Sequence, residues 1–280
     1  MSRLFVALAF VLAFTLSACQ RETTDEIAES EVELAELDAS IEASFDESDA
    51  YAFEAMDVTD FSVNARRYVN AADRLINACV TVTHDSINKV VTLDFGTGCV
   101  GPDGRTRSGQ IVISYTQRLY VPGATLTIDH VNYSVDSVMV AGTRIITNVS
   151  PNFQSNISLN TQLVGGMLVW PNGDTATRAF TRTATWMRAV NPINDELHVD
   201  GSATGTTRNA VAYTTQTLST LIFKRSCRRS DGIRVPVEGV VSIQRGSQPK
   251  VQIDYGDGTC DRLATLSRNG QTRVITLRNR

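Results

Sequence analysis

Two aspartates, Asp94 and Asp254, each follow an apolar alternating run and begin an Asp-aromatic-Gly triplet. Two carboxylates brought together in this way could share a proton and activate water for hydrolysis. Such catalytic pairs need a small hydroxyl residue after the aspartate, whereas Phe95 and Tyr255 occupy that position here. The triplets therefore predict turns in which the aspartate caps the turn and the glycine adopts a positive φ.

Other residues capable of metal or nucleophilic chemistry are dispersed. Asp254, Asp257 and Asp261 could offer oxygen ligands to calcium, but they lack the Asp-x-Asp-x-Asp-Gly spacing with a distal glutamate, so we interpret them as turn residues. No histidine has a second histidine at i+2 or i+4, as a metal site would favour. The three histidines are His84, His130 and His198. We expect no metal, no cofactor and no catalytic residue, and hence a protein that is not an enzyme.

Cysteines are the remaining reactive residues, and four of them follow residue 60: Cys79, Cys99, Cys227 and Cys260. An even number of cysteines in an exported chain favours disulfide bonds. Zinc is the rival use of four cysteines, but it prefers close Cys-x2-4-Cys pairs, and the sequence has none.

A repeated stretch predicts how the cysteines pair. The first copy runs from Lys89 to Cys99, and the second from Lys250 to Cys260. Each copy has an apolar alternating run, an Asp-aromatic-Gly turn, a cysteine and a Gly-Gln pair further on, which predicts a strand, a tight turn and a return strand. Because each copy has its own upstream cysteine, we predict the pairs Cys79–Cys99 and Cys227–Cys260, worth about 3 to 4 kcal/mol each.

From Cys79 onward the chain has the pattern of an all-β protein. Threonine, valine and isoleucine alternate with polar residues between Asn-Gly, Asp-Gly and Pro-Gly turn signals, which predicts antiparallel hairpins in sequence order. Ile111, Ile113 and Tyr115 should share one strand face. We expect about twelve strands over residues 61–280, in a meander that forms a sandwich or curls into a half-barrel or barrel.

The N-terminus has the features of an export signal. Arg3 precedes an apolar run from Leu4 to Leu16, which is too short to span a bilayer as a helix. The sequence Leu16-Ser-Ala-Cys19 resembles the lipobox of bacterial lipoproteins. That resemblance implies a signal peptide at residues 1–18, a lipid thioether on Cys19, a fatty acid such as palmitate on its amino group, and a stable membrane anchor. Gln20 at the next position resembles the signal for the outer membrane.

Charge divides the rest of the chain into two parts. Residues 20–60 have a local charge of −14 and lack glycine and proline, whereas residues 61–280 have a charge of +9, mostly from arginine. Ile27, Leu34 and Ile41 recur every seven residues and would form a thin apolar stripe on a helix. We predict that residues 19–60 are an acidic, partly helical tether, and favour this over a stable helix docked on the sheet.

A longer pattern points to a family. The pattern Asp-Phe-Gly-x-Gly-Cys-x-Gly-x-Asp-Gly-Arg-x-Arg-x-Gly, from Asp94 to Gly109, resembles that of uncharacterised β-rich lipoproteins of Gram-negative bacteria. The resemblance runs from about Cys79 to the C-terminus. It implies an envelope protein and carries no known activity.

One predicted strand face could bind a ligand. Threonines occupy one face of residues 175–188, and arginine alternates with aromatic residues on the other. That second face consists of Arg178, Phe180, Arg182, Trp186 and Arg188. It could grip an anionic envelope polymer or a partner protein, or be an exposed face on which arginine stems cover the aromatic rings. No nucleic acid is expected.

We therefore expect a non-enzymatic binding or structural module of the cell envelope. The alternative is a lipid or lipoprotein carrier, in which a curved sheet covers an apolar cavity closed by residues 25–56. A hydrolase with a site assembled from dispersed residues is a third possibility.

Overall fold

The computed structural model describes residues 41, 44–56, 75–233 and 235–277. The predicted signal peptide, the proposed lipid site Cys19 and most of the predicted acidic tether lie outside the described residues. The strands are β1 (Thr81–Asp85), β2 (Val90–Asp94), β3 (Cys99–Val100), β4 (Thr106–Tyr115), β5 (Thr125–Val135), β6 (Val138–Asn148), β7 (Ile157–Val169), β8 (Thr175–Met187), β9 (Glu196–Thr206), β10 (Ala212–Lys224), β11 (Glu238–Arg245), β12 (Val251–Asp257), β13 (Leu263–Arg268) and β14 (Gln271–Thr276).

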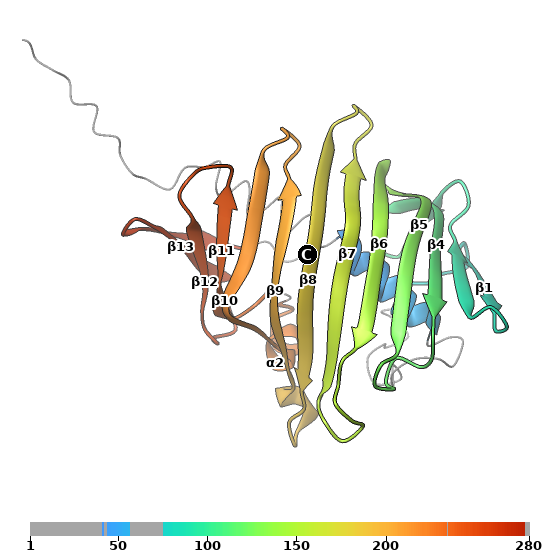
Figure 1. Ribbon diagram of the computed structural model, residues 1–280, viewed down its shortest axis with the longest axis horizontal. Coiled ribbons are helices and arrows are strands. Elements are labelled where there is room, and N and C mark those ends of the chain that lie inside the picture. The colour runs from blue at the N-terminus through green and yellow to red at the C-terminus, as the bar shows by residue number, and fades with distance from the viewer. Residues whose placement is uncertain (1–40, 42–43, 57–74, 234, 278–280) are drawn as a thin grey trace, which may run out of the picture.

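These strands form one open antiparallel sheet (Figure 1). Strands follow one another across the sheet in sequence order from β1 to β14, and only the two-residue β3 lies off this path, paired with β4. The all-β antiparallel meander is therefore confirmed, in a single open sheet of fourteen strands and not in a closed barrel or a two-sheet sandwich. The strand number is higher than the predicted twelve.

Alternation along the strands gives the sheet two different faces. In β4, Ile111, Ile113 and Tyr115 are buried on one face, as predicted, while Val112 and Ser114 between them are partly exposed on the other. We call the first the inner face and the second the outer face. The outer face is rich in threonine, serine and amide side chains that hydrogen bond across strands, such as Ser158 with Thr185 at 2.8 Å.

A helix at residues 44–56 covers the inner face of the N-terminal half of the sheet (Figure 1, blue). Phe45, Tyr51 and Met56 are buried in one core with side chains of β2 and β4–β8. The predicted partial helicity is confirmed at residues 44–56, but the helix there is docked on the sheet, which was the less favoured of the two predicted alternatives. The apolar stripe is thin, but carboxylates beside it pair with arginines of the sheet and add to its binding.

The C-terminal half has its own small clusters. Ile243, Val251 and Leu266 are among the buried residues of β10–β13 that pack together. The short helix α2 (Arg225–Ser230) contributes the buried Cys227 to a third cluster, and the 3-10 helix η3 (Pro192–Asn194) lies in the loop before β9. Among the described residues, no helix has the length and apolar character needed to cross a membrane.

Both predicted disulfide bonds are present, Cys79–Cys99 and Cys227–Cys260. The two copies of the repeat also share their turn. Asp94 Oδ1 accepts from the Gly96 N–H at 2.7 Å, and Asp254 Oδ1 accepts from the Gly256 N–H at 2.9 Å. Both glycines have positive φ, of 60° and 97°. The copies then diverge, because the first Gly-Gln lies inside β4 and the second in the β13–β14 turn.

Candidate functional site

Strand β8 places the predicted arginine–aromatic side chains on the inner face. Arg178 and Phe180 are buried, Arg182 and Trp186 are partly buried, and Arg188 is exposed just beyond the strand. The alternation is as predicted. The face is covered, however, because it lies on the same side of the sheet as the helix.

A fourth arginine, Arg144 of β6, completes the cluster around Phe180. The guanidinium carbons of Arg144, Arg178 and Arg182 lie 5.0, 5.7 and 5.1 Å from the centre of the Phe180 ring. Cation–π attraction of this kind strengthens when the charge is desolvated, and Arg144 is fully buried. Arg144 was not among the site residues predicted from the sequence, although it alternates with the apolar Ile146 in β6 and so occupies a core position.

Asp46 of the helix binds two of these arginines at once. Its Oδ1 lies 2.9 Å from Arg144 Nη2 and 2.7 Å from Arg182 Nη2. Burial disfavours the charged carboxylate, but the charges and hydrogen bonds of Arg182 and Arg144 outweigh burial and hold the pKa of Asp46 below its ordinary value. Asp49, one turn further on, approaches Arg144 Nη2 to 2.7 Å through its Oδ2.

Glu47 makes a second set of ion pairs toward β4. Its two oxygens lie 2.7 Å from Arg107 Nε and 2.6 Å from Arg105 Nη1. The buried Arg107 guanidinium also binds Asp103 Oδ2 at 2.7 Å and lies over the Tyr51 ring at 5.3 Å. Although burial disfavours its charge, the hydrogen bonds of Asp103 and Glu47 raise the pKa of Arg107. Burial raises the pKa of Tyr51 to about 12.

Ser48 lies between these carboxylates and binds His130 of β5. The His130 Nε2 is 2.8 Å from Ser48 Oγ, and its Nδ1 is 2.8 Å from the Gly142 carbonyl oxygen. A carbonyl oxygen only accepts, so Nδ1 carries the proton and Nε2 accepts from the serine hydroxyl. Burial lowers the pKa of His130, which favours this neutral form.

Four consecutive side chains of the helix, at residues 46–49, thus contact β4, β5, β6 and β8. This arrangement binds carboxylates. Its Ser48–His130 pair places a hydroxyl beside a neutral imidazole, but Ser48 is fully buried, so no substrate can reach that hydroxyl while the helix is docked. The side chains of Phe45, Tyr51 and Met56 are buried between helix and sheet, at the place where a carrier would need an apolar cavity. We call the three arginines around the Phe180 ring, Arg144, Arg178 and Arg182, the arginine face.

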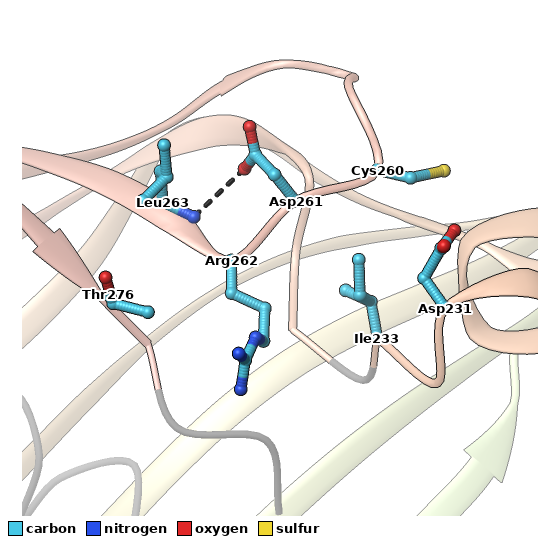
Figure 2. Close-up of a pocket in the computed structure, with 7 residues that line it drawn as sticks. All are labelled: Asp231, Ile233, Cys260, Asp261, Arg262, Leu263 and Thr276. Atoms are coloured by element: carbon cyan, nitrogen blue, oxygen red, sulfur yellow. Dashed lines mark hydrogen bonds between the residues drawn. The ribbon is translucent and has the colours of Figure 1, made fainter.

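Two surface depressions have ionisable side chains in their linings. The first, of about 540 Å³, adjoins the Cys227–Cys260 disulfide (Figure 2). Asp261 Oδ1 accepts from the Leu263 N–H at 2.9 Å, and the Arg262 guanidinium points away from both carboxylates in the lining. Its lining residues are Asp231, Ile233, Cys260, Asp261, Arg262, Leu263 and Thr276.

The second depression, of about 530 Å³, includes His198, Ser219 and Asp254 in its lining. His198 Nε2 bonds to Glu196 Oε2 at 2.8 Å, and no hydrogen bond joins His198 to Ser219 among the described side chains. Within the described residues, no cluster of histidine, cysteine and carboxylate side chains has the geometry to hold a metal ion. Asp254, Asp257 and Asp261 each accept from a backbone N–H of their own turn.

The chain matches no protein-family model, no curated protein and no solved structure. The arrangement of its own side chains is therefore the basis for any statement about function. The two disulfide bonds indicate an extracytoplasmic protein, because such bonds persist in oxidising compartments.

Proposed function

We propose that this protein is a non-catalytic binding module of the cell envelope, anchored to the outer membrane by lipid on Cys19. Its arginine face would hold acidic chains, first the acidic helix of the protein itself and, once that helix leaves, an anionic envelope polymer. One observation supports this most directly: the Asp46 carboxylate is shared by Arg144 and Arg182 beside the Phe180 ring. A carboxylate on a uronic-acid polymer has the same charge and geometry.

The helix would act as a resident competitor. Its ion pairs occupy Arg182 and Arg144, whereas Arg188 and the partly buried Trp186 lie further along β8 toward the strand end. A polymer would replace Asp46 at Arg182, which is 24% exposed, before it reached the fully buried Arg144. Charge-assisted hydrogen bonds to guanidinium are stronger than neutral ones, so the exchange needs a dense run of carboxylates.

Binding of a soluble uronic-acid polymer to the full chain in detergent tests this proposal. Replacing Asp46→Asn, Glu47→Gln and Asp49→Asn together should weaken helix docking and raise polymer affinity at least about tenfold, in a manner that added salt reverses. Adding Arg182→Ser and Arg188→Ser should abolish the gain. The matched control is Asp200→Asn on the outer face, which should leave affinity unchanged.

Equal polymer affinity in the parent chain and in the variant with Asp46→Asn, Glu47→Gln and Asp49→Asn would contradict the proposal. Binding that survives both arginine substitutions would place the polymer elsewhere. The anchor is tested separately by mass spectrometry of the N-terminal peptide, which should contain acylated Cys19.

A further inference from the structure

The two ends of the sheet expose different side chains. In an antiparallel meander every second connection lies at the same end, so the loops after β4, β6 and β8 lie together at the bottom of Figure 1. Large apolar side chains are exposed in and beside these three loops. They are Tyr120, Val149, Phe153, Met187 and Val190, which we call the lower-end patch.

Contacts between the loops join the patch into one surface. The Tyr120 and Phe153 rings lie 6.5 Å apart between their centres, which links the first two loops. Asn156 Nδ2 approaches Met187 Sδ to 3.4 Å, and Arg188 Nη2 donates to the Ser155 carbonyl at 3.2 Å, which links the second loop to the end of β8.

The loop that presents Phe153 is held in a defined turn. Asn152 Oδ1 accepts from the backbone N–H groups of Gln154 and Ser155, at 3.0 and 2.9 Å, and from the Ser155 hydroxyl at 2.9 Å. This turn leaves Phe153 61% exposed at its tip. An aromatic side chain fixed outward in this way would lose less conformational entropy on insertion than one in a loose loop.

The opposite end is more polar. In its turns Arg105 pairs with Asp136, and Arg208 pairs with Asp174 while stacking 4.3 Å from the centre of the Trp170 ring. Among the residues that the structure describes, the large apolar side chains exposed in and beside these turns are Val100 and Met139. The exposed apolar area is therefore concentrated at the lower end.

Basic residues accompany the lower-end patch. Arg118 lies in the same loop as Tyr120, and Arg188 lies between Met187 and Val190. Apolar tips flanked by arginine match a lipid surface with anionic headgroups, because the tips enter the acyl boundary while guanidinium groups stay among the phosphates. A protein partner would favour a concave groove, whereas these exposed side chains lie at the tips of loops at one end of the sheet.

We propose that the lower-end patch inserts into an anionic lipid surface, so that the sheet stands on the membrane with its strands directed away from it. This contact goes beyond the proposed lipid anchor, which would hold the chain near the membrane without fixing which end faces it. It also requires no movement of the helix at residues 44–56.

The experiment places a tryptophan at each end of the sheet. The full chain with Phe153→Trp or Val190→Trp is reconstituted into vesicles of phosphatidylethanolamine and phosphatidylglycerol with brominated acyl chains. The control is Val100→Trp, since Val100 is 57% exposed at the opposite end, close to the 61% of Phe153. The parent chain gives the baseline fluorescence of the native Trp170 and Trp186, against which the added emission is measured. Near-ultraviolet circular dichroism checks that each variant folds.

We expect brominated lipid to quench the added emission at positions 153 and 190 at least about twofold more than at position 100. Similar quenching at positions 153 and 100 in chains that float with the vesicles would overturn the patch and leave the anchor standing. Chains that do not float would overturn both the patch and the anchor.

Discussion

Arg144 Nη2 lies 2.9 Å from Asp46 Oδ1 and 2.7 Å from Asp49 Oδ2, so one fully buried guanidinium binds two carboxylates of the same helix. An ion of this kind is stabilising only while its partners are in place, because the cost of removing it from water has already been incurred. The two contacts of Arg144 therefore couple docking of the helix to the folding of β6.

Replacing Arg144 should destabilise the protein strongly. In Arg144→Met, Asp46 and Asp49 both lose the Arg144 guanidinium, so we expect a loss of about 3 to 5 kcal/mol in the free energy of unfolding. Urea denaturation followed by circular dichroism measures it. Arg182→Met is the control, and its smaller expected loss reflects a side chain that is 24% exposed. Equal losses for both variants would contradict this account.

Acid should release the helix. The Arg107 hydrogen bonds lower the pKa of Asp103 to about 2, and Arg182 and Arg144 lower that of Asp46. A carboxyl whose folded pKa is depressed contributes stability that is fully present above its unfolded pKa, near 3.8, and is lost as the pH falls toward the folded value. The urea concentration at which half of the protein is unfolded should therefore decrease as the pH is lowered from about 4 to about 2. Asp103→Asn should make this fall shallower, and an unchanged slope would refute the assignment.

A methyl group at Gly205 should not fit. Its Cβ would lie 2.1 Å from the Thr177 carbonyl oxygen and 2.9 Å from the Tyr213 ring, both of which are fixed by strand pairing and burial. Gly205→Ala should cost roughly 2 to 4 kcal/mol of stability by overpacking. Gly173→Ala is the comparison, because nothing lies within 4 Å of its Cβ and the cost comes only from φ of +87°, at about 1 kcal/mol. Thermal unfolding of the two variants should rank them in that order.

Removing either disulfide bond should also destabilise the protein, by similar amounts. The loops close over 20 residues for Cys79–Cys99 and 33 residues for Cys227–Cys260. The chain-entropy estimate gives about 3 and about 4 kcal/mol for the double alanine variants. Urea midpoints of the two variants measure the losses. A negligible loss for one of them would mean that its loop is already ordered in the unfolded chain.

The local features of the fold could be predicted from the sequence because they depend on neighbouring residues. Asp94 and Asp254 cap their own turns, as the repeated triplet indicated. Alternation placed Ile111, Ile113 and Tyr115 on one face, and the repeat identified both disulfide pairs.

The docked helix could not be predicted in the same way, because its partners are distant. Asp46 lies 98 residues from Arg144 and 136 from Arg182 along the chain. Fifteen carboxylates in residues 20–60 indicated mutual repulsion, whereas those at residues 46–49 are neutralised by arginines of the sheet. The charge difference between the two segments was visible in the sequence. It explains helix docking as well as it would explain a free tether, so the sequence alone did not distinguish the two.

The open sheet has an odd number of strands on its main path. Thirteen strands lie on the path from β1 to β14, and every neighbouring pair is antiparallel, so the first and last strands run in the same direction. Joining them would require a parallel seam in an otherwise antiparallel structure, which is the weaker kind of pairing. Strand parity therefore works against ring closure and keeps β1 and β14 as two separate borders of the sheet.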